Sequence, residues 1–360
     1  MRALRKLQPG ASELTVTHMP VPQPGTGEVR IVVFAAGMCG TDLHIIDGSY
    51  SSSPPVTLGH EIAGTVDSVG SGVDEGWIGA RVAPEPAVSC GHCEWCEAGI
   101  PMHCLTRRSL GTHIDGGFAE YVIVPVRNLH VLPSSLSDRA GALLEPLACV
   151  CNALTDPELI TPGDRVLVTG PGTIGILAAQ AALAFGARTT LLGLDRDTSR
   201  LAIASRIGLD ARSLDDPETR RALEDEASNR QIQMVIECSG AEPAVAWALS
   251  LLRPRGRLVQ LGLLSDDTSI SLAGAIKREI SITSSFGSTP ASWRRGIELV
   301  ADDVITLEPL MTSVLPLDGW AEAVRQSQAQ EGIKTLFDPG PPRVRAERTA
   351  SSTSTRGLQG

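Results

Sequence analysis

The sequence predicts an α/β protein in which a β-rich lobe precedes a doubly wound parallel sheet, and two observations support this prediction. Up to about residue 148, β-branched residues cluster or alternate in short stretches between glycines and prolines, so this part looks all-β; the stretches are 28–36, 61–70, 80–88 and 118–126. From about residue 160, apolar strand candidates alternate with helical patterns, which is typical of βαβ units. A length of 360 residues with 42% hydrophobic side chains suffices for two domains with substantial cores.

The second part has a regular alternation of elements. Strands are expected at 165–170, 188–195, 233–240 and 257–264, and helices at 176–187, 197–208 and 241–256. The longest apolar run, from Ile174 to Ala187, is interrupted by Gln180 and is too short for a membrane helix, so we interpret it as a buried helix.

The end of the chain is expected to return to the first lobe. A helix at 287–303, short strands and a last helix at 319–330 are predicted to pack against that lobe. Residues 339–360 are poor in apolar side chains and are predicted to be disordered.

The charge and the N-terminal residues exclude several classes of partner. A formal charge of −10 argues against nucleic acid, because phosphate binding relies on clustered Lys and Arg, and a small-molecule substrate fits better. The start MRALRKLQPG is positively charged but has no apolar stretch behind it, unlike a signal peptide. We therefore expect no membrane partner and a cytoplasmic protein with reduced thiols. A homo-oligomer, either a dimer or a tetramer, is also expected.

Four of the eight cysteines form the pattern C-x2-C-x2-C-x7-C in the stretch 90–104. Cysteines two residues apart are poor disulfide partners, whereas thiolates at this spacing can converge on a tetrahedral zinc ion at about 2.3 Å. Reduced or redox-active thiols are the alternative. A zinc ion held by four protein ligands has no position left for a substrate and would be structural. The predicted ligands are Cys90, Cys93, Cys96 and Cys104.

A G-x-G-x-x-G pattern stands between the strand candidate 165–170 and an apolar helix. In this context Gly170 is expected to make the turn, Gly172 to let the backbone approach a pyrophosphate, and Gly175 to let helix and strand pack closely. The start of the helix would supply free N–H groups to the phosphates. Glycines that serve close packing alone are the alternative, and we predict a dinucleotide site.

Asp195, at the end of the second strand, bears on which dinucleotide binds. A carboxylate at this position can accept hydrogen bonds from the adenosine ribose and repels a 2′-phosphate, which favours NAD over NADP. Arg196 and Arg200 weaken this preference, because either guanidinium could hold a 2′-phosphate or flank the adenine.

The first lobe contains further metal-binding residue types in GMCGTDLH, GHE and LLEPL. Cys39, His60, Glu61 and Glu145 offer one sulfur, one nitrogen and two carboxylates, all of which bind zinc. Each is unremarkable alone, since a His-Glu pair is more often hydrogen-bonded than a ligand pair and a Glu-Pro step is often a turn. Their combination with the cysteine pattern and the nucleotide loop indicates a second, catalytic zinc ion.

With these motifs, GGFAEY and the later ECSG, the chain resembles the zinc-dependent medium-chain dehydrogenase/reductase family, in its alcohol, polyol and threonine dehydrogenase branch. The resemblance extends over about residues 1–338. It implies a GroES-like catalytic domain formed by 1–148 and 288–338, a Rossmann NAD-binding domain at 149–287 inserted between them, and the catalytic zinc ion at the cleft.

The resemblance also implies a ligand set for the catalytic zinc ion. Cys39 and His60 would be constant ligands, and either Glu61 or Glu145 would bind directly while the other acts through water or in exchange. We rank Glu61 ahead. Neighbouring residues of a regular strand point to opposite faces, so a shared ion at His60 and Glu61 requires an irregular backbone. Asp42 would orient His60.

Other roles are implied for residues around these ligands. Thr41 and His44 would relay the alcohol proton to solvent, although an exposed loop histidine is the alternative for His44. A zinc ion with an open position can bind the substrate oxygen and favour its deprotonation before hydride transfer to the nicotinamide. Cofactor contacts are implied at Ile174, Ser239, Leu261, Gly262, Leu263, Ser285 and Phe286.

A carboxylate beside the zinc ion, in place of the additional cysteine of simple alcohol dehydrogenases, is the pattern of the polyol and threonine branch. The predicted reaction is NAD-dependent oxidation of a secondary alcohol, such as a polyol, sugar alcohol or cyclitol, to a ketone. Gly287 stands where some polyol dehydrogenases carry an arginine that touches the substrate, which argues against a plain sorbitol enzyme. The alternatives are threonine, another amino alcohol or a simple alcohol as substrate, and a zinc-stabilised NAD(H)-binding sensor without turnover.

Overall fold

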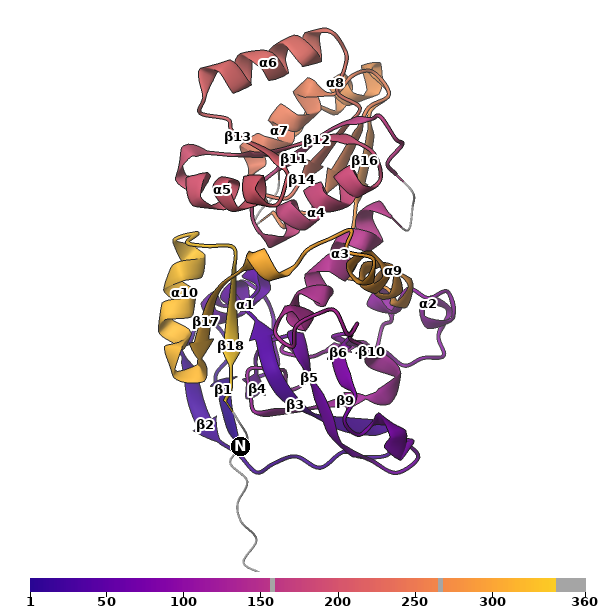
Figure 1. Ribbon diagram of the computed structural model, residues 1–360, viewed down its shortest axis with the longest axis vertical. Coiled ribbons are helices and arrows are strands. Elements are labelled where there is room, and N and C mark those ends of the chain that lie inside the picture. Colours follow the sequence, from indigo (N-terminus) through magenta and orange to yellow (C-terminus); the bar gives the residue numbers. More distant parts are fainter. Residues whose placement is uncertain (156–158, 265–267, 341–360) are drawn as a thin grey trace, which may run out of the picture.

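The computed structural model describes residues 1–155, 159–264 and 268–340, and it contains a lower β-rich lobe and an upper lobe with a parallel sheet (Figure 1). Of the tail predicted to be disordered, residues 341–360 lie outside the described ranges.

The lower lobe is built mainly from antiparallel strands of both ends of the chain. Its strands are β1 (Arg2–Lys6), β2 (Leu14–His18), β3 (Glu28–Gly37), β4 (Val56–Thr57), β5 (Glu61–Val69), β6 (Arg81–Pro84), β7 (Ala87–Val88), β8 (Arg108–Ser109), β9 (Tyr121–Pro125), β10 (Leu129–Val131), β17 (Met311–Pro316) and β18 (Lys334–Asp338). The largest sheet has the order β10-β6-β5-β3-β18-β17, with β9 also paired to β3. The return of the chain end to the first lobe is therefore confirmed, because β18 pairs with β3.

The first part of the chain also contains helices, so the all-β expectation for it was incomplete. They are α1 (Gly40–Asp47), α2 (Glu94–Glu97) and α3 (Leu144–Leu154). Helix α1 is too short for a clear apolar period, and local contacts define its ends. The Asp42 side chain accepts a hydrogen bond from the Cys39 N–H at its start, and Gly48 ends it with a φ of +86°. The buried Lys6 ammonium donates to the Ile45 carbonyl at 2.7 Å and so binds the last turn.

The upper lobe contains a six-stranded parallel sheet. Its strands are β11 (Arg165–Thr169), β12 (Arg188–Gly193), β13 (Asp210–Ser213), β14 (Met234–Glu237), β15 (Arg257–Gln260) and β16 (Ser281–Ser284), and its helices are α4 (Thr173–Ala184), α5 (Thr198–Arg206), α6 (Pro217–Ser228), α7 (Glu242–Leu251) and α8 (Leu272–Lys277). The strand order is β13-β12-β11-β14-β15-β16. The chain thus begins at the central strand β11, adds β12 and β13 on one side and then β14, β15 and β16 on the other, as predicted for a doubly wound Rossmann sheet. The carboxyl ends of β11 and β14 thus lie side by side, where such sheets bind nucleotides.

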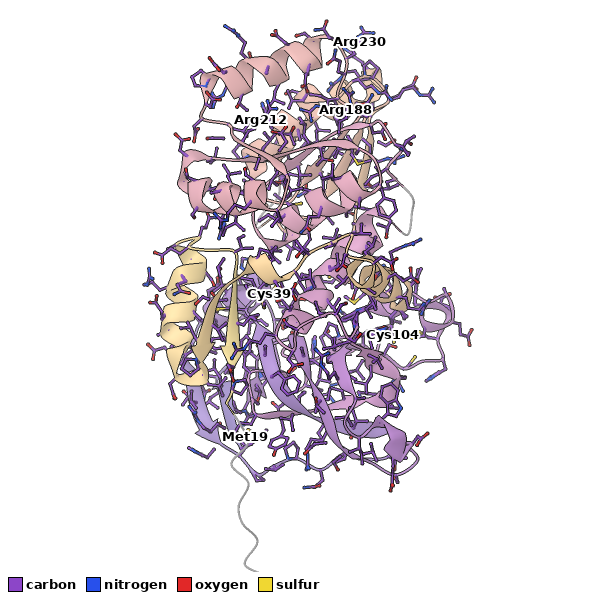
Figure 2. The ribbon with its side chains drawn as sticks, viewed as in Figure 1. Met19, Cys39, Cys104, Arg188, Arg212 and Arg230 are labelled. Carbon is purple, nitrogen blue, oxygen red and sulfur yellow. The ribbon has the colours of Figure 1, made fainter. Side chains whose placement is uncertain are left out.

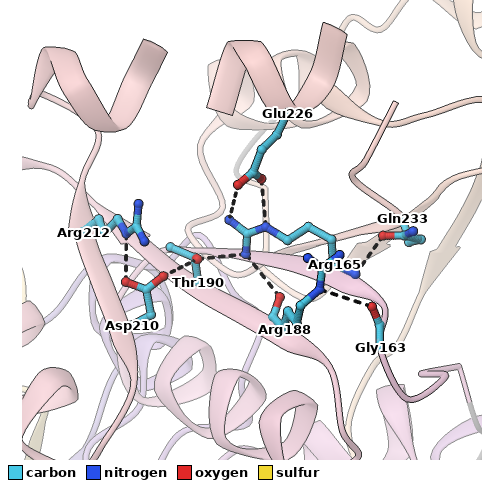
Figure 3. A network of polar contacts seen from close by, with 8 residues as sticks. All are labelled: Gly163, Arg165, Arg188, Thr190, Asp210, Arg212, Glu226 and Gln233. Atoms are coloured by element: carbon cyan, nitrogen blue, oxygen red, sulfur yellow. Dashed lines mark hydrogen bonds and ion pairs between the residues drawn. The ribbon is translucent and has the colours of Figure 1, made fainter. Parts of the chain in front are cut away.

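A polar network holds one edge of this sheet together (Figure 3). The Arg165 guanidinium at the start of β11 binds both carboxylate oxygens of Glu226 on α6, at 2.8 and 3.2 Å. It also donates to the Thr190 hydroxyl on β12, which in turn donates to Asp210 on β13. Arg212 completes the chain of contacts with Asp210 at 2.8 Å. Polar side chains therefore link three neighbouring strands and a covering helix, in addition to the apolar packing of Leu167, Leu192 and Leu223.

An apolar core runs continuously from one lobe to the other. Helix α3 packs against α9 (Pro290–Ala301) and α4, and the cluster includes Leu147, Leu177 and Trp293 together with Val168 of the parallel sheet. The last helix, α10 (Trp320–Gln328), covers the sheet of the lower lobe near β17 and β18 (Figure 1). This shared packing sets the position of the upper sheet relative to the site below it.

Candidate active site

A cavity of about 460 Å³ lies at the junction of the two lobes, and residues of both lobes line it. Cys39, His60 and Glu145 contribute from the lower lobe, and Ile174 and Leu261 from the upper lobe. Figure 2 places Cys39 at this junction, beside the start of α1. The predicted metal ligands and part of the predicted nucleotide contacts therefore face one space.

Three predicted metal ligands come together in this cavity. The donor atoms of Cys39, His60 and Glu61 all lie within 4.8 Å of one another. Glu145 lines the same cavity but is not part of this close set, and its carboxylate contacts the Cys149 sulfur at 3.5 Å. His60 stands just before β5, which begins at Glu61, so the irregular backbone that a shared ion requires is present.

The donor set fits a divalent cation. The Glu61 Oε2 atom is buried and has no hydrogen-bond partner among the described residues. Gly37, opposite Glu61 on β3, leaves room for this oxygen, because a Cβ there would lie 2.0 Å from it. Burial lowers the pKa of His60, but a hydrogen bond with Cys39 and the charges of Cys39, Asp42 and Glu145 raise this pKa well above its usual value. The pocket thus favours a positive charge, which a metal ion would supply in place of a proton.

Asp42 connects two of the metal donors. Its carboxylate is fully buried at the start of α1, with Oδ2 accepting from the Cys39 N–H at 2.9 Å. Its other oxygen, Oδ1, lies 3.9 Å from Nδ1 of His60. This separation is longer than a hydrogen bond, and Asp42 Oδ1 has no hydrogen-bond partner among the described residues.

Thr41 and His44 follow on the same helix and both line the cavity. The Thr41 hydroxyl lies 3.7 Å from the Cys39 sulfur. The His44 side chain is 43% exposed, and its Nδ1 lies 3.1 Å from the Ser49 hydroxyl. Thr41 therefore lies next to the metal donors, while the His44 side chain reaches solvent.

Lys334, on β18, is a site residue that the sequence analysis missed. Its ammonium is buried and lies 2.7 Å from Glu61 Oε1 and 2.9 Å from the Met38 carbonyl. Burial lowers the pKa of Lys334, but the charges of Glu61 and Cys39 raise it above its usual value overall. A lone lysine within the apolar stretch IKTLF was the available signal.

The four clustered cysteines form a second candidate metal site beside α2. Their sulfurs lie within 4.8 Å of one another, with the Cys96 sulfur 3.6 Å from that of Cys93 and 3.9 Å from that of Cys90. Four sulfurs bound tetrahedrally at about 2.3 Å have edges of about 3.8 Å, so the geometry fits zinc. Hydrogen bonds from the Cys90 N–H and from Thr106 lower the pKa of Cys104 to about 6, which favours the thiolate.

The glycine loop has the geometry expected of a nucleotide turn. Gly170 has a φ of +86°, and a Cβ on it would lie 2.8 Å from the Ser239 backbone. Gly172 precedes the first residue of α4, and a Cβ on it would meet no atom within 4 Å. A Cβ on Gly175 would lie 1.9 Å from the Gly170 carbonyl oxygen. Two glycines thus serve packing, while Gly172 leaves open space at the start of the helix.

The residues predicted to choose between NAD and NADP lie beyond this loop. Asp195 begins the short 3-10 helix that follows β12, and its carboxylate accepts from the Ser213 hydroxyl at 2.6 Å. Arg200 lines the cavity, where its Nε donates to the Gly332 carbonyl at 2.5 Å. Asp195 is exposed but does not line the cavity, and Arg200 is partly occupied by a contact with the lower lobe.

The other predicted cofactor residues divide into two groups. Leu261, Gly262, Leu263, Ser285 and Phe286 line the cavity together with Ile174. Ser239 does not, because its N–H and hydroxyl both donate to the carboxylate of Glu237. Glu237 is fully buried and also accepts hydrogen bonds from the Gly240 N–H and from the Gln260 side chain. Its carboxylate therefore links the loop that follows β14 to the end of β15.

Among the described residues, no helix is long and apolar enough to cross a membrane.

Comparison with known proteins gives two family models that match the chain. A model described as "Alcohol dehydrogenase GroES-like domain" matches residues 25–134, and one described as "Zinc-binding dehydrogenase" matches residues 173–302. A sorbitol dehydrogenase of Halalkalibacterium halodurans is 36% identical over 342 residues, which cover 94% of this chain and 99% of that protein.

Two solved structures share the whole fold. An Escherichia coli protein described as a short chain alcohol dehydrogenase, in complex with NADH, has a TM-score of 0.84 and is 30% identical, covering 94% of this chain and 99% of that chain. A Sinorhizobium meliloti protein described as a zinc-binding dehydrogenase, bound to NADP, has a TM-score of 0.85 and is 33% identical, with the same coverage of 94% and 99%.

Proposed function

Because the chain belongs to the zinc-dependent medium-chain dehydrogenase/reductase family, we propose that it oxidises a secondary alcohol of the polyol type to a ketone with NAD. The observation that carries this proposal is the cavity in which Cys39, His60 and Glu61 converge beside the glycine loop.

The proposed division of the chain follows from this arrangement. Residues 1–148 and 288–338 form the catalytic domain, and residues 149–287 form the nucleotide-binding domain. The support is that β17 and β18 extend the mainly antiparallel sheet of the lower lobe, whereas the six strands of the all-parallel sheet belong to the upper lobe.

The proposed catalytic zinc ligands are Cys39, His60 and Glu61, with Glu145 as the carboxylate that approaches the ion through water or in exchange. The unpartnered oxygen of Glu61 supports this ranking, as does the absence of Glu145 from the close donor set. The four-cysteine cluster would hold the structural zinc ion. When bound, the catalytic zinc ion supplies a Lewis acid that acidifies the substrate hydroxyl, and the nicotinamide supplies the hydride acceptor.

The chain's own residues handle the proton of the reaction. Thr41, beside the Cys39 sulfur, is placed to hydrogen-bond a reacting hydroxyl and to relay its proton, taking that proton while its own hydroxyl proton passes on toward His44. His44 is one helical turn further along α1, and its partly exposed imidazole can release a proton to solvent. Asp42 and Lys334 hold His60 and Glu61 in place, since each carries a buried charge beside one of them.

We propose NAD as the preferred cofactor. The support is the Asp195 carboxylate at the end of β12, which suits a ribose hydroxyl better than a 2′-phosphate. The similar structures hold both kinds of dinucleotide, so this preference rests on Asp195 itself.

The test is a screen of zinc-loaded enzyme against matched polyols, cyclitols, amino alcohols and simple secondary alcohols, each with NAD and NADP. We expect turnover with a polyol and NAD, and two zinc ions per chain in elemental analysis. A single zinc ion with no turnover of any alcohol would instead favour a sensor that binds NAD(H). Preferred turnover of threonine or another amino alcohol would move the substrate to the neighbouring branch of the family.

A further inference from the structure

One wall of the cavity carries an arginine to which the reaction above gives no task. Arg107 lines the same space as Cys39, His60 and Glu145, although it belongs to the segment that follows the cysteine cluster. Its backbone N–H donates to the Cys104 carbonyl at 3.1 Å. The cluster therefore fixes the part of the wall from which this side chain extends.

The Arg107 guanidinium has no acidic partner among the residues that the structure describes. Its guanidinium contacts the Met102 sulfur, 3.6 Å from Nη1, and a thioether is a weak acceptor. A guanidinium has five N–H donors in a planar fork that matches a carboxylate or a phosphate. Most of this donor capacity thus remains available to a molecule in the cavity.

Met102 holds this guanidinium at the seam between the two lobes. A Cβ on Gly287 would lie 2.5 Å from the Met102 methyl group, so the thioether fills the space that a side chain at 287 would need. Both residues line the cavity. The absence of a side chain at Gly287 is therefore compensated sterically by Met102, whose sulfur also contacts the Arg107 guanidinium.

The cavity is lined by charged side chains of both signs. Cys39, Glu61 and Glu145 line it together with Lys334, whose ammonium lies 2.7 Å from Glu61, and Arg107 lines it without an acidic partner among the described residues. Near Arg107, burial lowers the pKa of His113, and the charges of Arg107 and Arg108 lower it further. A substrate that offers a hydroxyl to the metal donors and an anionic group to Arg107 would complement both sets of residues.

We propose that Arg107 binds an anionic group of the substrate, a phosphate or a carboxylate, at a distance from the reacting hydroxyl. This inference rests on the proposed function, because it names the substrate class of the same site. The substrate is then a polyol or hydroxy compound with an acidic end group rather than a neutral sugar alcohol.

The test compares matched substrates on wild type, Arg107→Met, Arg107→Lys and the control Arg108→Met. Each neutral sugar alcohol is paired with its terminal phosphate ester and with the corresponding sugar acid. We expect wild type to prefer one anionic member. Arg107→Met should lose about tenfold to a hundredfold in kcat/KM on that member, mainly through KM, with little change on the neutral alcohol. Arg107→Lys should recover part of the loss, and the phosphate and sugar-acid arms identify the anion.

Arg108 is a suitable control because its guanidinium is bound to the His113 carbonyl at 2.8 Å and does not line the cavity. Binding is measured separately by calorimetry, with the sugar phosphate and the sugar acid added to the enzyme–NADH complex. The proposal is overturned if wild type prefers the neutral alcohol, if Arg107→Met loses equally on neutral and anionic substrates, or if it weakens NADH binding alone. Turnover of neutral alcohols that is independent of Arg107 leaves the proposed function standing, whereas failure of every alcohol overturns that function instead.

Discussion

A substitution at Gly172, the second glycine of the nucleotide loop, can distinguish an effect on folding from an effect on cofactor binding, because Gly172→Ala adds only one methyl group. A Cβ on Gly172 meets no protein atom within 4 Å, and its φ of −81° is open to any residue. Gly172 is the N-cap of α4, and at this position replacing Gly by Ala changes the stability of the helix by about a few tenths of a kcal/mol up to about 1 kcal/mol. Gly172→Ala should therefore change the melting temperature by at most about 4 °C.

The same methyl group should matter when the cofactor binds. If the pyrophosphate approaches the backbone at Gly172, the added carbon occupies space that the phosphate needs, and such overpacking costs about 1–3 kcal/mol. We therefore expect the Kd for NADH to rise by about fivefold to 150-fold. Fluorescence titration with NADH measures this change, and thermal unfolding of the free enzyme measures the stability.

Gly175 provides the matched control. A Cβ at this position would lie 1.9 Å from the Gly170 carbonyl oxygen, so either the turn or α4 must shift. Gly175→Ala should lower the melting temperature of the free enzyme well beyond the change caused by Gly172→Ala. An unchanged Kd for Gly172→Ala would refute the assignment of this loop to the pyrophosphate, and so would a loss of stability equal to that of Gly175→Ala.

Four further substitutions, with Lys334→Arg as a rescue variant, test the metal sites and the cofactor preference. Cys39→Ala should abolish turnover while NADH binding is nearly intact, whereas Cys93→Ala should first reduce the folding yield and the zinc content; full activity of Cys39→Ala would contradict the metal site. Asp195→Ala should weaken binding of NAD more than that of NADP in parallel titrations, and an unchanged ratio would place the ribose elsewhere. Lys334→Met leaves the buried Glu61 carboxylate without its ammonium, so chemical denaturation of the metal-free protein should show a loss of about 3–5 kcal/mol, with partial recovery in Lys334→Arg. Equal stability of Lys334→Met and wild type would mean that the Lys334–Glu61 ion pair does not stabilise the folded protein.

Local motifs allowed candidate metal and nucleotide sites to be predicted because their spacing is independent of the rest of the fold. The four clustered cysteines and the glycine loop each lie in one short stretch, and their geometry follows from that stretch. Cys39, His60 and Glu61 required the resemblance to a family, since nothing in their spacing shows that two separate segments meet. Lys334 could not be placed at all, because it lies 273 residues from Glu61 and the two meet only through the pairing of β18 with β3.

The elements of the fold also differ in how well a local sequence pattern predicts them. The four apolar strands of the parallel sheet and helices α4, α5 and α7 were predicted from their patterns. The two edge strands were missed, because β13 (DARS) and β16 (SITS) are short and polar, with mostly exposed side chains. Edge strands gain their order from hydrogen bonds to the neighbouring strand, and a single sequence contains no record of that neighbour.

The late position of β18 affects how the protein is made on the ribosome. Cys39, His60 and Glu61 leave the exit tunnel early, whereas the ammonium that balances the Glu61 carboxylate follows 273 residues later. Until β18 has been synthesised, the candidate metal site therefore lacks both its counter-charge and a strand of its sheet. The site can reach its final form only after the entire nucleotide-binding lobe has been made, so its assembly waits for the strand that follows this lobe.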